Sequence, residues 1–262
     1  MMRYFRLFAV QLRASLQVSM QYRIDFLVGS FMALFWMSWN LAPMLVVWSH
    51  RPTVAGWTLH EAFLVSAWFM FLKSVLEGAV QPSLLAVVEH IRKGTLDFIL
   101  LKPADAQFLV STAKFEVNQI VDTFGAIGLA VYAFIHIGRV PSEGEVAVAL
   151  LLTLASAGLL YALAIFVVSA AFWVVRLDNL IYLFNSIFDA GRWPATVFRG
   201  LWRIFFTFVI PLALMTTYPA LAVLGRLSGQ TAALALGGAL CFMILARLVW
   251  LRAIGHYTSA SS

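Results

Sequence analysis

Long apolar runs, separated by short polar segments, dominate the pattern of hydrophobic and polar positions along the chain. An α-helix needs about 20 apolar residues to cross the hydrocarbon core of a bilayer. Runs near that length cover about residues 26–48, 62–88, 117–138, 146–175 and 231–251. They are continuous and do not alternate with a period of two, so they predict helices and not the strands of a membrane barrel. An all-α membrane protein follows, with residues 1–262 forming a single transmembrane domain.

Two arrangements fit the remaining stretch, residues 176–225. In the first, residues 201–224 form an ordinary span. In the second, the amphipathic residues 176–192 form a polar-faced span, and residues 195–225 form a re-entrant pair of half-helices broken near Pro211. Irregular backbone at membrane depth is tolerated where it is buried in protein or lines a cavity, so the second arrangement would place it beside a pathway. Both arrangements have six crossings and put the two termini on one side.

The N-terminal segment, residues 1–24, precedes the first span. At 100° per residue, aromatic and leucine side chains of residues 3–23 fall on one side, and arginines and glutamines fall on the other. This pattern predicts an amphipathic helix lying on the membrane surface. A plain basic leader is the alternative interpretation.

Composition supports lipid as the main solvent, because 62% of the residues are hydrophobic and 11% are charged. The net charge of +6 does not indicate nucleic-acid binding, because the basic residues gather at the ends of the apolar runs, as the positive-inside bias predicts. That bias places the termini in the cytoplasm, together with Arg3, Arg6, Arg13, Arg23, Arg92, Lys93, Lys102, Lys114, Arg176 and Arg252. The residues placed outside are Arg51, Arg139 and Arg226. Three further residues lie inside in the first arrangement and outside in the second, so charge alone favours the first: Arg192, Arg199 and Arg203.

Few residues offer chemistry inside the membrane. Lys73 and Glu77 are four apart on one helix face, so they can pair, and Asp122 lies early in the third long run. A structural ion pair and a substrate or proton path both remain open for these residues. Cys241 is the only cysteine, which excludes an internal disulfide. We expect no ATP site, because no G-x-x-x-x-G-K-[ST] loop is present. We also expect no metal site and no catalytic residue.

The stretch EHIRKGTLDFILLKP, residues 89–103, concentrates charge on the cytoplasmic side. Gly94 predicts the end of the preceding helix, Thr95 predicts the cap of a short second helix, and Pro103 prevents its continuation. Asp97 falls in its first turn. An apolar stripe at spacings of three and four comprises Leu96, Ile99 and Leu100. Such a stripe can rest on lipid headgroups or dock into a groove of another protein.

RKGTLDFILLKP, followed by the late RWPATVFRGLWRIFFTFVIPLALMTTYPALAVLG, resembles the permease subunits of ABC-2-type transporters, in the branch with a cytoplasmic G-x-L-[DE]-x-x-L-x-x-P signature. The resemblance implies that the short helix couples to a separate ATPase subunit, which would bind ATP and Mg²⁺. Residues that match the signature are Gly94, Leu96, Asp97, Leu100 and Pro103.

The resemblance also implies an exporter in the bacterial plasma (inner) membrane, a second permease that is identical or related, and re-entrant half-helices at about 195–225. Pro194, Pro211 and Pro219 become candidates for an outer gate. A rival interpretation is a secondary transporter or channel, driven by an ion gradient through Lys73, Glu77 and Asp122. No motif supports a membrane scaffold or a membrane enzyme, and the substrate is not predicted.

Overall fold

The computed structural model describes residues 2–21, 23–173 and 178–257, and it is helical, with no strand among these residues. Five helical segments are long and apolar enough to cross a membrane: Phe26–His50, Leu59–Arg92, Val117–Ile137, Glu143–Phe172 and Gly229–Ile254. Each lies within a few residues of a predicted run. The prediction of an all-α membrane protein is therefore confirmed.

The elements follow one another along the chain as α-helices and short 3₁₀ or π turns (η). Their bounds are α1 Met2–Gln21, α2 Arg23–His50, α3 Leu59–Val75, η1 Leu76–Val80, α4 Gln81–Arg92, α5 Asp97–Leu100, α6 Ala106–Ser111, η2 Val117–Gln119, α7 Ile120–Ile137, α8 Glu143–Ser169, η3 Ala170–Phe172, α9 Asp178–Phe188, η4 Asp189–Arg192, η5 Ala195–Val197, α10 Leu201–Ile204, η6 Phe205–Val209, η7 Ala213–Thr217, α11 Tyr218–Val223 and α12 Gly229–Ile254.

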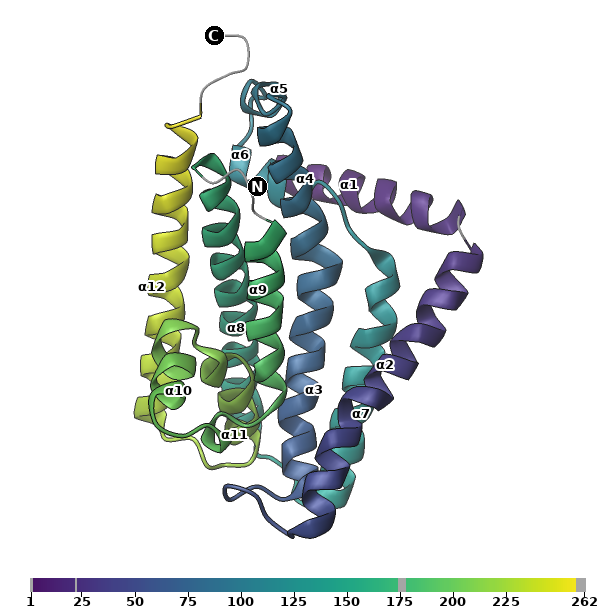
Figure 1. The fold of residues 1–262 in the computed structure, drawn as a ribbon, viewed down its shortest axis with the longest axis vertical. Helices are drawn as coiled ribbons and strands as arrows, with labels where there is room; N and C mark the ends of the chain where they lie inside the picture. Colours follow the sequence, from purple (N-terminus) through teal and green to yellow (C-terminus); the bar gives the residue numbers. More distant parts are fainter. Residues whose placement is uncertain (1, 22, 174–177, 258–262) are drawn as a thin grey trace.

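The long helices run side by side along the molecule, with α3 near the centre (Figure 1). Its main neighbour is α7, and η7, α11, η4 and α8 also contact it, while α12 packs mainly on α8. Fully buried side chains of α3, α8 and η7 form the core between them, among them Leu64, Leu72, Leu152, Leu160 and Met215. At one end, here named the α5 end, lie α5, α6, α1 and the last turn of α12; at the other, the α10 end, lie α10 and α11 (Figure 1).

The N-terminal amphipathic segment is a helix, α1, that lies across the α5 end at a steep angle to the long helices (Figure 1). One of its faces is held by the chain that follows α6. The rings of Phe8 and Phe115 meet edge to face with centroids 5.5 Å apart, and the amide N of Phe115 donates to Ser15 Oγ over 3.1 Å. Its location on a membrane surface stays a prediction.

A π turn, η1, interrupts the second long helix between α3 and α4, and Pro82 in the sequence explains the interruption. Pro82 has no N–H, so it cannot bond the carbonyl of Gly78 four residues earlier. That carbonyl accepts from the amide N of Glu116 over 2.8 Å instead. The approach is close, because a Cβ on Gly78 would lie 3.0 Å from Cβ of Gln119. The turn therefore fixes Glu77 beside the start of α7.

Residues 201–224 do not form one continuous helix. The backbone is extended at Ile210 (φ −121°, ψ 91°), as a residue before proline prefers, and Pro211 follows. The break separates α10 and η6 from η7 and α11, and all four lie at the α10 end (Figure 1). Within the predicted 176–192 segment, Arg176 lies outside the described residues, and α9 occupies Asp178–Phe188 beside α8.

Candidate functional site

The segment between α4 and α6 forms a compact cap at the α5 end. Gly94 has φ +65°, a left-handed conformation that suits glycine, and stops α4 as predicted. The amide N of Thr95 then donates to the carbonyl of His90 over 2.9 Å. Lys93 pairs with Glu89 over 2.5 Å on the exposed side of the last turn. The chain consequently reverses sharply into α5.

The prediction that Thr95 caps the next helix is wrong. The residue that precedes α5 is Leu96, and no side chain caps the helix. The Thr95 hydroxyl instead forms a hydrogen bond with Nδ1 of His90 over 2.8 Å. Thr95 therefore stabilises the end of α4 and not the start of α5. Without a cap, α5 is a single turn, and the exposed Pro103 follows it.

The apolar stripe of α5 points into the molecule. Leu96 is fully buried, with 0% of its surface exposed, and Ile99 and Leu100 pack partly buried against the core. The exposed apolar residues are Phe98, at 71%, and Leu101, at 82%. The sequence analysis did not identify Phe98 and Leu101, although their spacing of three residues places them together on the face opposite to the buried stripe.

A polar network lies behind α5 and joins three elements. Arg247 of α12 donates to both carboxylate oxygens of Asp105 over 3.2 and 2.5 Å and to Oε1 of Gln107 over 2.7 Å. Gln107 donates onward to the Tyr161 hydroxyl of α8 over 2.9 Å. Asp105 also accepts from the amide N of Phe108 and so caps α6. The hydrogen bond from Arg247 lowers the pKa of Asp105 below its ordinary value, so the pair is ionised at neutral pH.

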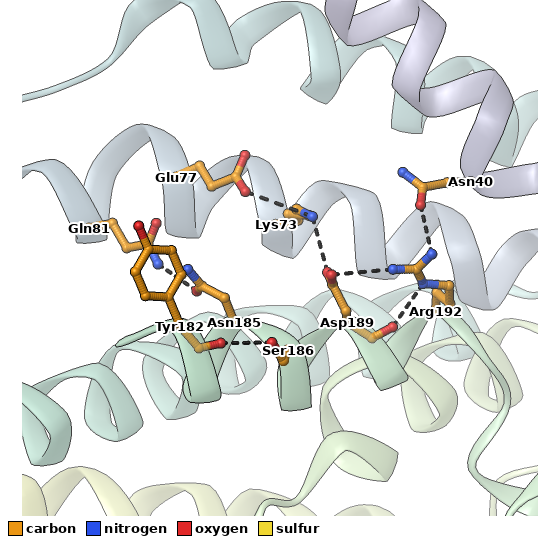
Figure 2. A network of polar contacts seen from close by, with 9 residues as sticks. All are labelled: Asn40, Lys73, Glu77, Gln81, Tyr182, Asn185, Ser186, Asp189 and Arg192. Atoms are coloured by element: carbon orange, nitrogen blue, oxygen red, sulfur yellow. Dashed lines mark hydrogen bonds and ion pairs between the residues drawn. The ribbon is translucent and has the colours of Figure 1, made fainter. Parts of the chain in front are cut away.

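The predicted pair of Lys73 and Glu77 forms, but it is one part of a larger network (Figure 2). Their charged atoms lie 3.8 Å apart, whereas Lys73 Nζ lies 3.0 Å from Oδ1 of Asp189 in η4. Asp189 also lies 3.3 Å from Arg192, which donates to Oδ1 of Asn40 in α2 over 2.7 Å. Sequence spacing could not reveal Asp189, because it lies 116 residues from Lys73.

Lys73, Glu77 and Asp122, the three predicted candidates, line one cavity of about 380 Å³ between α2, α3, η1 and the start of α7. Asn118 and Gln119 add amide groups to its wall. Among the described residues, no hydrogen bond or ion pair to Asp122 is present. A half-buried carboxylate without a direct partner in a membrane-spanning helix is costly and marks a functional candidate.

The three predicted gate prolines, Pro194, Pro211 and Pro219, are all buried at the α10 end. Thr217, between two of them, accepts from the amide N of Ala195 over 3.0 Å and ties their segments together. Nearby, Arg226 pairs over 2.5 Å with the buried Glu61 at the start of α3. The broken region is thus fastened to the bundle, and its part in gating stays a prediction.

Comparison with known families places the chain among membrane transport proteins. A family model described as ABC-2 family transporter protein matches residues 34–261. No curated protein and no solved structure matches the chain significantly. Within the described residues, no group of three or more His, Cys, Asp or Glu side chains is arranged to hold a metal ion.

Proposed function

The chain belongs to the ABC-2 family of transporter proteins, and on that premise we propose that it is the transmembrane permease of an ATP-driven exporter. A separate ATPase subunit binds ATP and Mg²⁺ and docks on α5. The observation that carries this proposal is the exposure of Phe98 and Leu101 on a short turn whose other face is anchored in the core.

Docking at α5 satisfies two physical requirements. Exposed Phe and Leu side chains gain roughly 1.5–3 kcal/mol each when a partner buries them fully, so they favour association. The buried Leu96, with Ile99 and Leu100, anchors α5 to the bundle, so a push on α5 moves the helices behind it. Gly94 and Pro103 bound the turn on either side and keep it short.

In this proposal the α5 end is cytoplasmic, in a bacterial inner membrane. The bundle crosses six times, with α9 and η4 as the fifth crossing and α10 to α11 as a re-entrant element at the outer face. Support comes from the basic residues of the α5 end, which include Arg92, Lys93, Lys102 and Arg252. Outward placement of Arg192, Arg199 and Arg203 opposes the positive-inside bias, and the hydrogen bond of Arg192 to Asn40 offsets part of its cost.

A second permease, identical or related, completes the pathway. The first span, α2, is mostly uncovered in the single chain, and its exposed side chains include the aromatic residues Phe31, Phe35, Trp36 and Trp39. Lipid alone could cover them, but an aromatic face in mid-helix also suits packing against a second copy.

The test is copurification with a coexpressed candidate ABC ATPase, followed by ATP-driven transport. We expect Phe98→Asp and Leu101→Asp each to reduce copurification and transport strongly, because each places a charge in the docking face. The matched control is Val140→Asp, an equally exposed apolar position, at 90%, on the opposite end between α7 and α8. Full copurification and transport in both α5 variants would contradict the coupling proposal.

A second candidate function is a transporter driven by an ion gradient. The observation that favours it is the set of ionisable groups in the cavity, Lys73, Glu77 and Asp122. Purified protein in vesicles, without any ATPase, would then transport in response to an imposed gradient. Substitution of Glu77 or Asp122 by its amide would abolish that transport.

A further inference from the structure

We propose that the cavity between α2, α3 and α7 binds a monovalent organic cation that carries an apolar or aromatic body. The inference rests on the proposed function, since it names the class of substrate that the permease would accept at this site. It is carried by three features of the cavity: its balance of charge, its unsatisfied acceptors and its apolar wall.

The charge balance of the network favours one positive charge. The ionisable groups in and beside the cavity are Lys73, Glu77, Asp122, Asp189 and Arg192. Three are carboxylates and two are cations, so one negative charge is left over when all five are ionised. Glu116, two residues before the lining residue Asn118, is paired with Lys114 over 2.9 Å and adds none. A ligand with a single positive charge neutralises the site, whereas an anion would add to the excess.

The acceptors that remain unsatisfied lie on the cavity. Lys73 lies closer to Asp189, at 3.0 Å, than to Glu77, at 3.8 Å, and Asp122 has no direct partner among the described residues. Buried acceptors are normally paired, so these groups favour a ligand that brings positive charge.

Part of the wall is apolar and argues against a bare inorganic ion. Trp36 and Met37 of α2 and Phe69 and Met70 of α3 line this part. Aromatic faces attract organic cations, and methionine adapts to ligands of varied shape. Phe69 already lies near Lys73 and Arg192, with the charged groups 5.8 and 5.7 Å from its centroid, so Trp36 is the ring available to a ligand. At about 380 Å³ the cavity falls within the range of about 300–1,000 Å³ typical of small-molecule sites.

The experiment measures binding of tetraphenylphosphonium to the purified full-length protein in lipid nanodiscs by equilibrium dialysis. Its control is tetraphenylborate, which has nearly the same shape and the opposite charge. We expect saturable binding of the cation only, and displacement of the cation by benzyltrimethylammonium. Saturable binding of the anion with similar affinity, or no saturable binding of the cation, overturns the proposal without needing any variant.

Variants then locate the site. Glu77→Gln and Asp122→Asn should each weaken cation binding roughly tenfold, the loss expected for one cation–carboxylate contact. Trp36→Ala should weaken it and Trp36→Phe should largely retain it. The matched control is Glu143→Gln, an exposed carboxylate at the start of α8 outside the cavity, which should bind like the wild type. Unchanged binding in both cavity variants, or an equal loss in the control, shows that the cation binds elsewhere.

Failure of this inference differs from failure of the proposed function. An ATPase that copurifies with a chain unable to bind the cation rejects the substrate class alone. Cation binding with normal dependence on Glu77 and Asp122, in a chain that transports without an ATPase, rejects the exporter and leaves the binding site standing.

Discussion

Asp189 is the residue that holds two cations within the helical bundle. It lies 3.0 Å from Lys73 and 3.3 Å from Arg192. Four-residue spacing correctly predicted that Lys73 and Glu77 share a helix face, but it predicted only the weaker contact, because helix periodicity reveals partners on the same helix. The stronger partner depends on how η4 docks against α3, which is a property of the tertiary fold.

Replacement of Asp189 tests this account. We expect Asp189→Asn to lower the free energy of unfolding by about 1–3 kcal/mol, because it removes the countercharge of the partly buried Arg192 and leaves Lys73 only the longer contact to Glu77, at 3.8 Å. A lower melting temperature in detergent would record the loss. Asp122→Asn is the matched control, since Asp122 has no ion pair among the described residues; an equal fall in both variants would contradict the assignment.

We expect the ion pair between Asp105 and Arg247, at the α5 end, to be lost in acid. The hydrogen bond from Arg247 lowers the pKa of Asp105 in the folded chain, so the pair stabilises the fold at neutral pH and is lost as pH falls below the ordinary aspartate value of about 4. We expect the melting temperatures of wild type and Asp105→Asn to differ at pH 7 and to converge as pH falls through the lowered pKa of Asp105, where the wild-type carboxylate takes up a proton. A difference that persists unchanged in acid would exclude this pair as its source.

At the scale of elements, α5 shows that helix periodicity determines which residues share a face, whereas packing determines where that face points. The stripe of Leu96, Ile99 and Leu100 was identified correctly as one face of a short helix. Its predicted direction, outward onto lipid headgroups or a partner protein, is wrong, because the end of the bundle offers the same apolar surface that a partner protein would. Here the bundle covers the stripe, and Phe98 and Leu101 remain for a partner.

The polar network between α6 and α12 should be energetically coupled, so that a push on α5 reaches both helices together. Arg247 joins α12 to Asp105, which also caps α6. In a double-mutant cycle, Asp105→Ser keeps a capping hydroxyl but removes the ion pair, and Arg247→Gln removes the guanidinium. We expect the losses in unfolding free energy to be non-additive by about 0.5–3 kcal/mol, the range for residues in one network. Strictly additive losses would show that the two residues act independently.

For the whole molecule, the spans were predictable because apolar length is a local property that lipid imposes directly. The five long segments lie within a few residues of their predicted bounds. The stretch from 176 to 225 was not decided by the sequence, because its charges and its prolines favour different arrangements. Its helices are short, and at the break before Pro211 the backbone is paired locally: the amide N of Ile210 donates to the carbonyl of Phe205, and the amide N of Leu212 donates to the carbonyl of Ile210.

Cysteine accessibility decides between the two arrangements in the membrane. Cys241, the only natural cysteine, is first replaced by serine, and single cysteines are introduced at Lys102, Val140 and Arg199. Because α10 lies at the end opposite to α5 (Figure 1), we expect a membrane-impermeant maleimide added to intact cells to label positions 140 and 199 but not 102. Position 102 should react only after the membrane is opened. If 201–224 were instead an ordinary span, position 199 would follow 102, since both would then face the cytoplasm. Labelling of 199 from outside would therefore support six crossings with a re-entrant element at the outer face, even though the arginines there oppose the charge bias.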